Sequence, residues 1–140
     1  MDNIVFSTVW RDEELIQIEA ICSSALITVV SRIYTCEALL DELISCIEKF
    51  LGRKSKEALW KNGTKGDKST PCLFLRFLKK DRCGHVVIEV FAELDDGGKY
   101  TEHNCCFFIN TEQGLLLDFC KKIARLKNRP IGYTVQLHDQ

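Results

Sequence analysis

The sequence has little net charge, only two prolines and no long apolar run. Its 19 lysines and arginines nearly balance 20 aspartates and glutamates, which leaves a net charge of -1. That balance excludes a strongly basic nucleic-acid-binding protein and a strongly acidic tail. No apolar stretch approaches the roughly 20 residues that cross a bilayer. Thr28, Ser31 and Arg32 interrupt even the most β-rich stretch, residues 25–34. We therefore expect neither a nucleic-acid partner nor a membrane partner.

The N-terminal residues lack the basic and apolar regions of a signal peptide, so we expect a cytoplasmic protein. With 140 residues, of which 46% are hydrophobic, the chain is predicted to form a single domain over residues 1–140. Eight cysteines would indicate disulfides in a secreted chain, but in a reducing compartment we expect free thiols. Several of them lie in apolar-periodic segments, where a thiol behaves as a small apolar side chain: Cys22, Cys46, Cys105 and Cys120.

Period-two alternation predicts strands over residues 15–22, 25–34, 72–79, 85–94, 99–109 and 131–137. Two segments between them have helical periodicity. The first is predicted to be capped by Thr35 and ended by Gly52. The second is predicted to be capped by Asn110 or Thr111 and to end before Pro130. The order ββ-α-βββ-α-β predicts an α+β fold with a mainly antiparallel sheet and two helices packed on one face.

Aligning the hairpins on their turns predicts which residues face each other. Ile18 should then face Val29 in the first hairpin. In the second half, Val86 should lie opposite both Phe77 and Phe107, with a continuous apolar face across three strands.

Two segments are predicted to lie outside the strands. One is a short N-terminal segment that ends at Trp10. The other is a long basic connection, residues 53–68, with Trp60 as its apolar anchor. This connection could bind phosphate groups, but we favour a solvated loop because charge runs commonly keep loops in water.

Two Cys/His clusters contain residue types that serve metal or thiol chemistry: Cys83-Gly84-His85 and His103-Asn104-Cys105-Cys106. The predicted register separates the two histidines by about 17 Å, too far for a shared metal ion. A thiolate–imidazolium pair is conceivable within each cluster, but the sequence offers no orienting third group or oxyanion loop. We therefore predict no metal, no cofactor and no enzymatic activity.

The other face of the three strands in the second half interleaves aromatic residues with charged residues. Such a composition is typical of protein-binding patches. The adjoining turn adds Asp95 and Asp96, whose negative field would attract a basic partner. The alternative is that a terminal strand, a loop or a second subunit covers this face. The predicted partner-binding residues are Phe74, Arg76, Glu89, Phe91, Glu93, Tyr100, Glu102, Asp95 and Asp96.

Residues 60 to about 126 resemble a family of small, uncharacterised bacterial proteins. The motifs that carry this resemblance are Trp60-Lys61-Asn62-Gly63, Leu73-Phe74-Leu75, the run DRCGHVVIEV at residues 81–90, and Gly114-Leu115-Leu116. These motifs are a turn, alternating strands and a helix start, so they imply a fold more than an activity.

The general character of the chain is also similar to that of bacterial immunity proteins, which protect a cell from the toxin domains of contact-dependent growth inhibition. That resemblance implies a small, non-enzymatic protein that binds one cognate toxin. The near-zero net charge departs from the acidity that is frequent among immunity proteins against nucleases. Two alternatives stay open. One is a homo-oligomeric interaction module, such as a homodimer, and the other is a small thiol enzyme that uses His85 or His103.

Overall fold

A computed structural model describes residues 2–52, 55–67, 70–94 and 103–139. Within these residues, eight strands form two four-stranded antiparallel sheets, accompanied by two helices. The first sheet has the strand order β3-β2-β1-β8 and comprises β1 (Asn3–Arg11), β2 (Ile16–Ser23), β3 (Thr28–Thr35) and β8 (Thr134–Gln136). The second has the order β4-β5-β6-β7 and comprises β4 (Glu57–Asn62), β5 (Leu73–Lys79), β6 (His85–Leu94) and β7 (His103–Glu112). The helices are α1 (Glu37–Gly52) and α2 (Gln113–Leu126).

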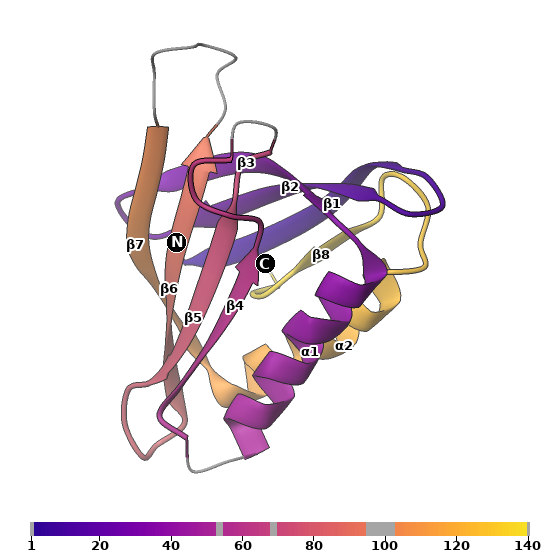
Figure 1. Ribbon diagram of the computed structural model, residues 1–140. Helices are drawn as coiled ribbons and strands as arrows, with labels where there is room; N and C mark the ends of the chain where they lie inside the picture. The colour runs from indigo at the N-terminus through magenta and orange to yellow at the C-terminus, as the bar shows by residue number, and fades with distance from the viewer. Residues whose placement is uncertain (1, 53–54, 68–69, 95–102, 140) are drawn as a thin grey trace.

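The two sheets face each other, and the helix pair lies across the side where they diverge (Figure 1). α1 contacts α2 and also β4, which is one edge of the second sheet. α2 contacts β8, which is an edge of the first sheet. The helices therefore bridge an edge of each sheet, and both sheets keep their far faces away from the helices.

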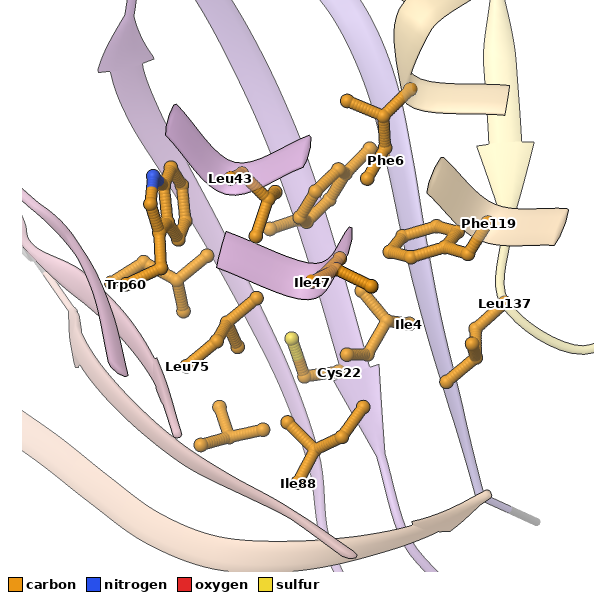
Figure 2. Close-up of a cluster of buried hydrophobic side chains, with 14 of the residues drawn as sticks. Ile4, Phe6, Cys22, Leu43, Ile47, Trp60, Leu75, Ile88, Phe119 and Leu137 are labelled. Atoms are coloured by element: carbon orange, nitrogen blue, oxygen red, sulfur yellow. The ribbon is translucent and has the colours of Figure 1, made fainter. Parts of the chain in front are cut away.

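The core fills the space between the sheets and the helices. Figure 2 shows Phe6 of β1 close to Phe119 of α2, and their ring centroids are 5.6 Å apart. Leu43 and Ile47 of α1 are fully buried in the same cluster as Leu75 of β5. The cluster thus joins both sheets and both helices. Burial of each such side chain stabilises the fold by about 1.5–3 kcal/mol relative to exposure.

Hydrogen bonds also join the sheets where β3 approaches the second sheet. The Ser31 hydroxyl donates to the backbone carbonyl of Glu93 at 3.1 Å. The Asn62 side-chain amide donates to the backbone carbonyl of Tyr34 at 2.9 Å. Ser31 and Asn62 are both buried, so these bonds satisfy polar groups that would otherwise be costly to bury.

The predicted α+β class and the antiparallel pairing are confirmed. The structure contains the predicted order of elements with two further strands. β1 lies in the N-terminal segment that was predicted to be outside the strands, and β4 lies within the predicted basic connection. The strands are divided between two sheets, so each helix packs against sheet edges as well as against the other helix.

The predicted faces of the strands are correct, but the predicted registers are displaced. Ile18 lies opposite Ile33, four residues from the predicted partner. Val86 lies opposite Lys79 and Thr111, two and four residues from its predicted partners. These displacements are even numbers of residues, so each side chain stays on its predicted face.

The first helix ends at Gly52 as predicted, but the predicted N-terminal caps of both helices are wrong. Thr35 is the last residue of β3 and its hydroxyl is buried, and the first helical bond runs from Leu40 N–H to the Cys36 carbonyl. Asn110 and Thr111 belong to β7, which passes directly into α2. Strand pairing with β6 holds both residues in extended conformation and overrides their capping preference.

Neither described helix combines the length and apolar composition needed to cross a membrane.

Candidate functional site

The candidate site is the outer face of the second sheet, which we define as the side opposite the core. Cross-strand pairing arranges its side chains in three rows, each running from β4 across β5 and β6 to β7. The rows are Lys61–Phe74–Phe91–Cys106, Leu59–Arg76–Glu89–Phe108 and Glu57–Leu78–Val87–Asn110. Because all these positions are on the same phase of the pleat, their side chains share one surface.

An aromatic pair forms the centre of the first row. The rings of Phe74 and Phe91 are tilted at 37° with centroids 5.7 Å apart, a favourable aromatic geometry. The Lys65 ammonium lies 4.2 Å from the Phe91 centroid, and the Lys61 ammonium lies 5.4 Å from the Phe74 centroid. Both distances are within the range of cation–π attraction. The two rings are half-buried, and lysine side chains form part of their cover.

Arg76 organises the second row. Its Nε lies 3.1 Å from a carboxylate oxygen of Glu89, and Nη1 lies 3.6 Å from a carboxylate oxygen of Glu57. The guanidinium is therefore held between carboxylates on both neighbouring strands. All three side chains are partly exposed, so the two ion pairs add little to stability. Their main effect is to fix the geometry of the Arg76 side chain.

The Glu93 carboxylate accepts hydrogen bonds from the backbone of the chain segment beside the outer face. Its two carboxylate oxygens accept hydrogen bonds from the backbone N–H of Gly66 at 3.0 Å and of Cys72 at 3.1 Å. Burial alone would raise the pKa of Glu93. A hydrogen bond with the Cys72 thiol, the two backbone N–H groups and nearby Lys65 outweigh burial and lower this pKa. Glu93 thus fixes the segment that carries Lys65 over the aromatic pair.

Two exposed apolar residues of this face were not predicted. Phe108 of β7 is 53% exposed and Leu59 of β4 is 40% exposed, at opposite ends of the Arg76 row. Phe108 could have been found from the sequence, because it has the same parity as the predicted Tyr100 and Glu102. Leu59 could not, because β4 was not predicted as a strand.

The structure brings together the five predicted site residues that it describes: Phe74, Arg76, Glu89, Phe91 and Glu93. The other four, Asp95, Asp96, Tyr100 and Glu102, lie outside the described residues. In the described part, the positive charges of Lys61, Lys65 and Arg76 balance the negative charges of Glu57, Glu89 and Glu93. The predicted attraction of a basic partner therefore depends on the residues outside it.

The two histidines of the Cys/His clusters lie at opposite ends of β6. His85 is the first residue of β6, and His103 pairs with its last residue, Leu94. At about 3.3 Å per residue this separation is roughly 30 Å, larger than predicted. Over residues 2–52, 55–67, 70–94 and 103–139, no group of three His, Cys, Asp or Glu side chains could hold a metal ion.

An orienting group for His85 was missed in the sequence. The Asp81 carboxylate lies 2.7 Å from His85 Nδ1, and this contact is the main cause that lowers the pKa of Asp81. The other carboxylate oxygen accepts the backbone N–H of Cys83 at 2.8 Å and of His85 at 3.3 Å. Asp81 therefore closes the turn between β5 and β6 as well as orienting the imidazole.

The basic segment contains a strand. Residues 57–62 form β4, and the Trp60 indole N–H donates to the Leu39 carbonyl at 2.9 Å. Trp60 is buried, so the predicted anchor is confirmed. Lys61 belongs to the outer face, so at least part of the positive charge of this segment lies on that surface.

No protein-family model matches this chain, and searches of curated proteins and of solved structures also gave no match.

Proposed function

We propose that this protein binds another protein through the outer face of the second sheet and acts by that binding, without catalysis. The observation that carries the proposal is the ordered cluster in which Lys61 and Lys65 cover Phe74 and Phe91. Aromatic and cationic side chains are enriched among the residues that dominate protein interfaces. Because these side chains are already held by one another, binding would cost little additional side-chain entropy.

The partner we propose is a folded toxin domain of a contact-dependent growth inhibition system, so that the protein acts as a cytoplasmic immunity protein. The resemblance described above supports this partner class. In addition, the ammonium groups of Lys61 and Lys65 form no ion pair with the described residues. A toxin surface that places carboxylates opposite these lysines would complement the face and fix the register of the complex.

The experiment is co-expression with the C-terminal region of the protein encoded immediately upstream. Growth rescue and co-purification are scored for the wild type and for the variants Phe91→Arg and Lys61→Glu. The matched control is Leu26→Arg, which changes an exposed leucine in the β2–β3 hairpin, away from the face. We expect rescue and a complex with the wild type and the control, and loss of both with the two face variants.

Each outcome is decisive if circular dichroism shows that the variants are folded. Absence of toxicity, or toxicity that the wild type does not relieve, contradicts the immunity function. Rescue by the wild type and by both face variants would retain the function but exclude this face.

A specific observation also favours a second candidate, a thiol enzyme, because Asp81 orients His85 two residues from exposed Cys83. This candidate requires Cys83 to react with iodoacetamide at neutral pH much faster than free cysteine does. A rate equal to or below that of free cysteine contradicts it.

A further inference from the structure

β7 is an edge strand without the usual protection against pairing. It makes ten consecutive pairs with β6 with no register shift, and residues 104–111 contain neither a charged residue nor a proline. Natural edge strands are commonly protected by charges, prolines, bulges or short length. β4, at the other edge, is short and carries Glu57 and Lys61. The two edges of the second sheet therefore differ, and β7 is the one suited to pairing (Figure 1).

The backbone direction shows which groups of β7 are available. Asn110 N–H points away from β6, because it donates to the Asp2 carboxylate at 2.7 Å. In an antiparallel pair every second residue directs both its N–H and its C=O to the same side. Asn104, Cys106 and Phe108 therefore direct their backbone groups to the free edge. Among the described residues these groups have no partner.

We propose that β7 pairs antiparallel with β7 of a second copy of this chain, with Cys106 opposite Cys106. This inference goes beyond the proposed function, because it concerns the edge of the sheet and a different partner. In this register Phe108 of each copy lies opposite Asn104 of the other. All the edge-facing groups between Asn104 and Phe108 are then paired. The second sheets of the two copies become one continuous eight-stranded sheet.

Asp2 excludes the registers that are centred further along β7. A pairing centred on Phe107 would place Asn104 opposite Asn110, and a pairing centred on Phe108 would place Cys106 opposite Asn110. In both cases the incoming strand would meet an Asn110 N–H that Asp2 already occupies. In the register centred on Cys106, the pairing of residues 104–108 does not use Asn110, so it leaves the bonds between Asp2 and Asn110 intact.

A second copy fits this edge because the paired residues bring no like charges together. The two copies are related by a two-fold axis perpendicular to the sheet, which keeps their outer faces on the same side. The row of outer-face residues that ends at Cys106 therefore continues into the second copy. An edge contact of this length belongs to the weak class of interfaces that bury less than about 1,200 Å². We therefore expect a monomer–dimer equilibrium instead of a permanent dimer.

The first test is sedimentation velocity of the complete chain from about 1 µM to about 1 mM, the range of weak association. The edge variant is Phe108→Lys, and the matched control is Leu59→Lys, an exposed apolar residue in the same row at the opposite edge. We expect dimer in the wild type and the control, and a dissociation constant at least about tenfold higher in Phe108→Lys. A wild type that is monomeric throughout overturns the proposal, even if Phe108→Lys weakens binding to another protein.

The second test reports the register. Opposite residues in a hydrogen-bonded antiparallel pair have Cα atoms about 5.5 Å apart, within the range that a disulfide accepts. Mild oxidation should therefore link two chains through Cys106. The crosslink should persist in Cys83→Ser, which removes the other clearly exposed thiol, and disappear in Cys106→Ser. A dimer that crosslinks only through Cys83 would overturn the β7 pairing.

Discussion

Replacing Glu93 by glutamine tests whether a single carboxylate holds the segment beside the outer face. Its two oxygens accept the backbone N–H groups of Gly66 and Cys72 at 3.0 and 3.1 Å. Glutamine has nearly the same size but only one side-chain oxygen. Its NH₂ group cannot accept a hydrogen bond. One of the two backbone donors must therefore lose its partner, and the remaining bond loses its charge.

The magnitude follows from these two bonds. A hydrogen bond to a charged group contributes about 1.5–3 kcal/mol when it is well shielded from solvent. Glu93 is only partly buried, so we expect Glu93→Gln to lower the free energy of unfolding by about 1–2 kcal/mol at neutral pH. The same change should loosen the position of Lys65 over Phe91, because Gly66 is the residue that follows Lys65.

The pH dependence has a definite sign. The pKa of Glu93 in the folded protein is lowered from its ordinary value of 4.5. Its contribution to stability is therefore fully present above that value and is lost as the pH falls through the lower pKa of the folded state. The stability difference between wild type and Glu93→Gln should shrink over this acidic range.

Urea unfolding at several pH values measures both effects. Glu89→Gln is the matched control, because Glu89 lies on the same strand and the same face but, within the described part of the chain, forms an ion pair only with the partly exposed side chain of Arg76. We expect this control to lower the free energy of unfolding by less than about 1 kcal/mol. Equal losses in the two variants, or a difference that does not change with pH, would refute the role assigned to Glu93.

Three further predictions test the fold. Trp60→Phe should lower the free energy of unfolding by about 1–3 kcal/mol in urea titrations, because the Leu39 carbonyl loses its donor. Burial raises the pKa of Cys22 to about 12, so Cys22 should stay unmodified by iodoacetamide in the native protein, while exposed Cys83 reacts. Mass spectrometry of peptides distinguishes the two thiols. Gly84→Ala should lower the melting temperature and cost about 1–3 kcal/mol, because Gly84 has a φ of +90°, which alanine adopts only with strain.

The sequence predicted correctly which face of a strand each residue is on, but it predicted the cross-strand partners poorly. Both results have one physical reason. Side chains alternate with a period of two, so an error of two or four residues in register leaves every residue on its predicted face. That is why Ile18 and Val86 were predicted to be buried although their predicted partners were wrong. The register was misjudged in all three hairpins, β2–β3, β5–β6 and β6–β7. In the first, the loop includes Ser24 to Ile27, because Ser24 N–H donates to the Ile27 carbonyl.

The missed strands have a different cause. β4 contains Glu57 and Lys61, charges that are common at the edge of a sheet but that resemble a solvated loop in the sequence. In β1 the burial alternates from Ile4 to Val9, and the pairing register with β2 shifts between Thr8 and Trp10 near the end of the strand. Tertiary pairing with β2 and β8 holds β1 in the first sheet, and local patterns do not report such pairing.

The same limit explains what was predicted of the candidate site. Phe74, Phe91 and Glu89 were placed on one face by alternation alone, and they do lie together there. The lysines that cover the rings come from β4 and from the segment that Glu93 holds, which only the folded structure brings close. The sequence indicated an acidic aromatic patch, whereas the described part of the face is a balanced surface with cations above its rings. For the proposed interface this implies that Lys61→Glu should affect partner binding at least as strongly as neutralisation of Glu89. The reason is that Glu89 already has Arg76 as a partner, whereas among the described residues Lys61 has only a ring beneath it.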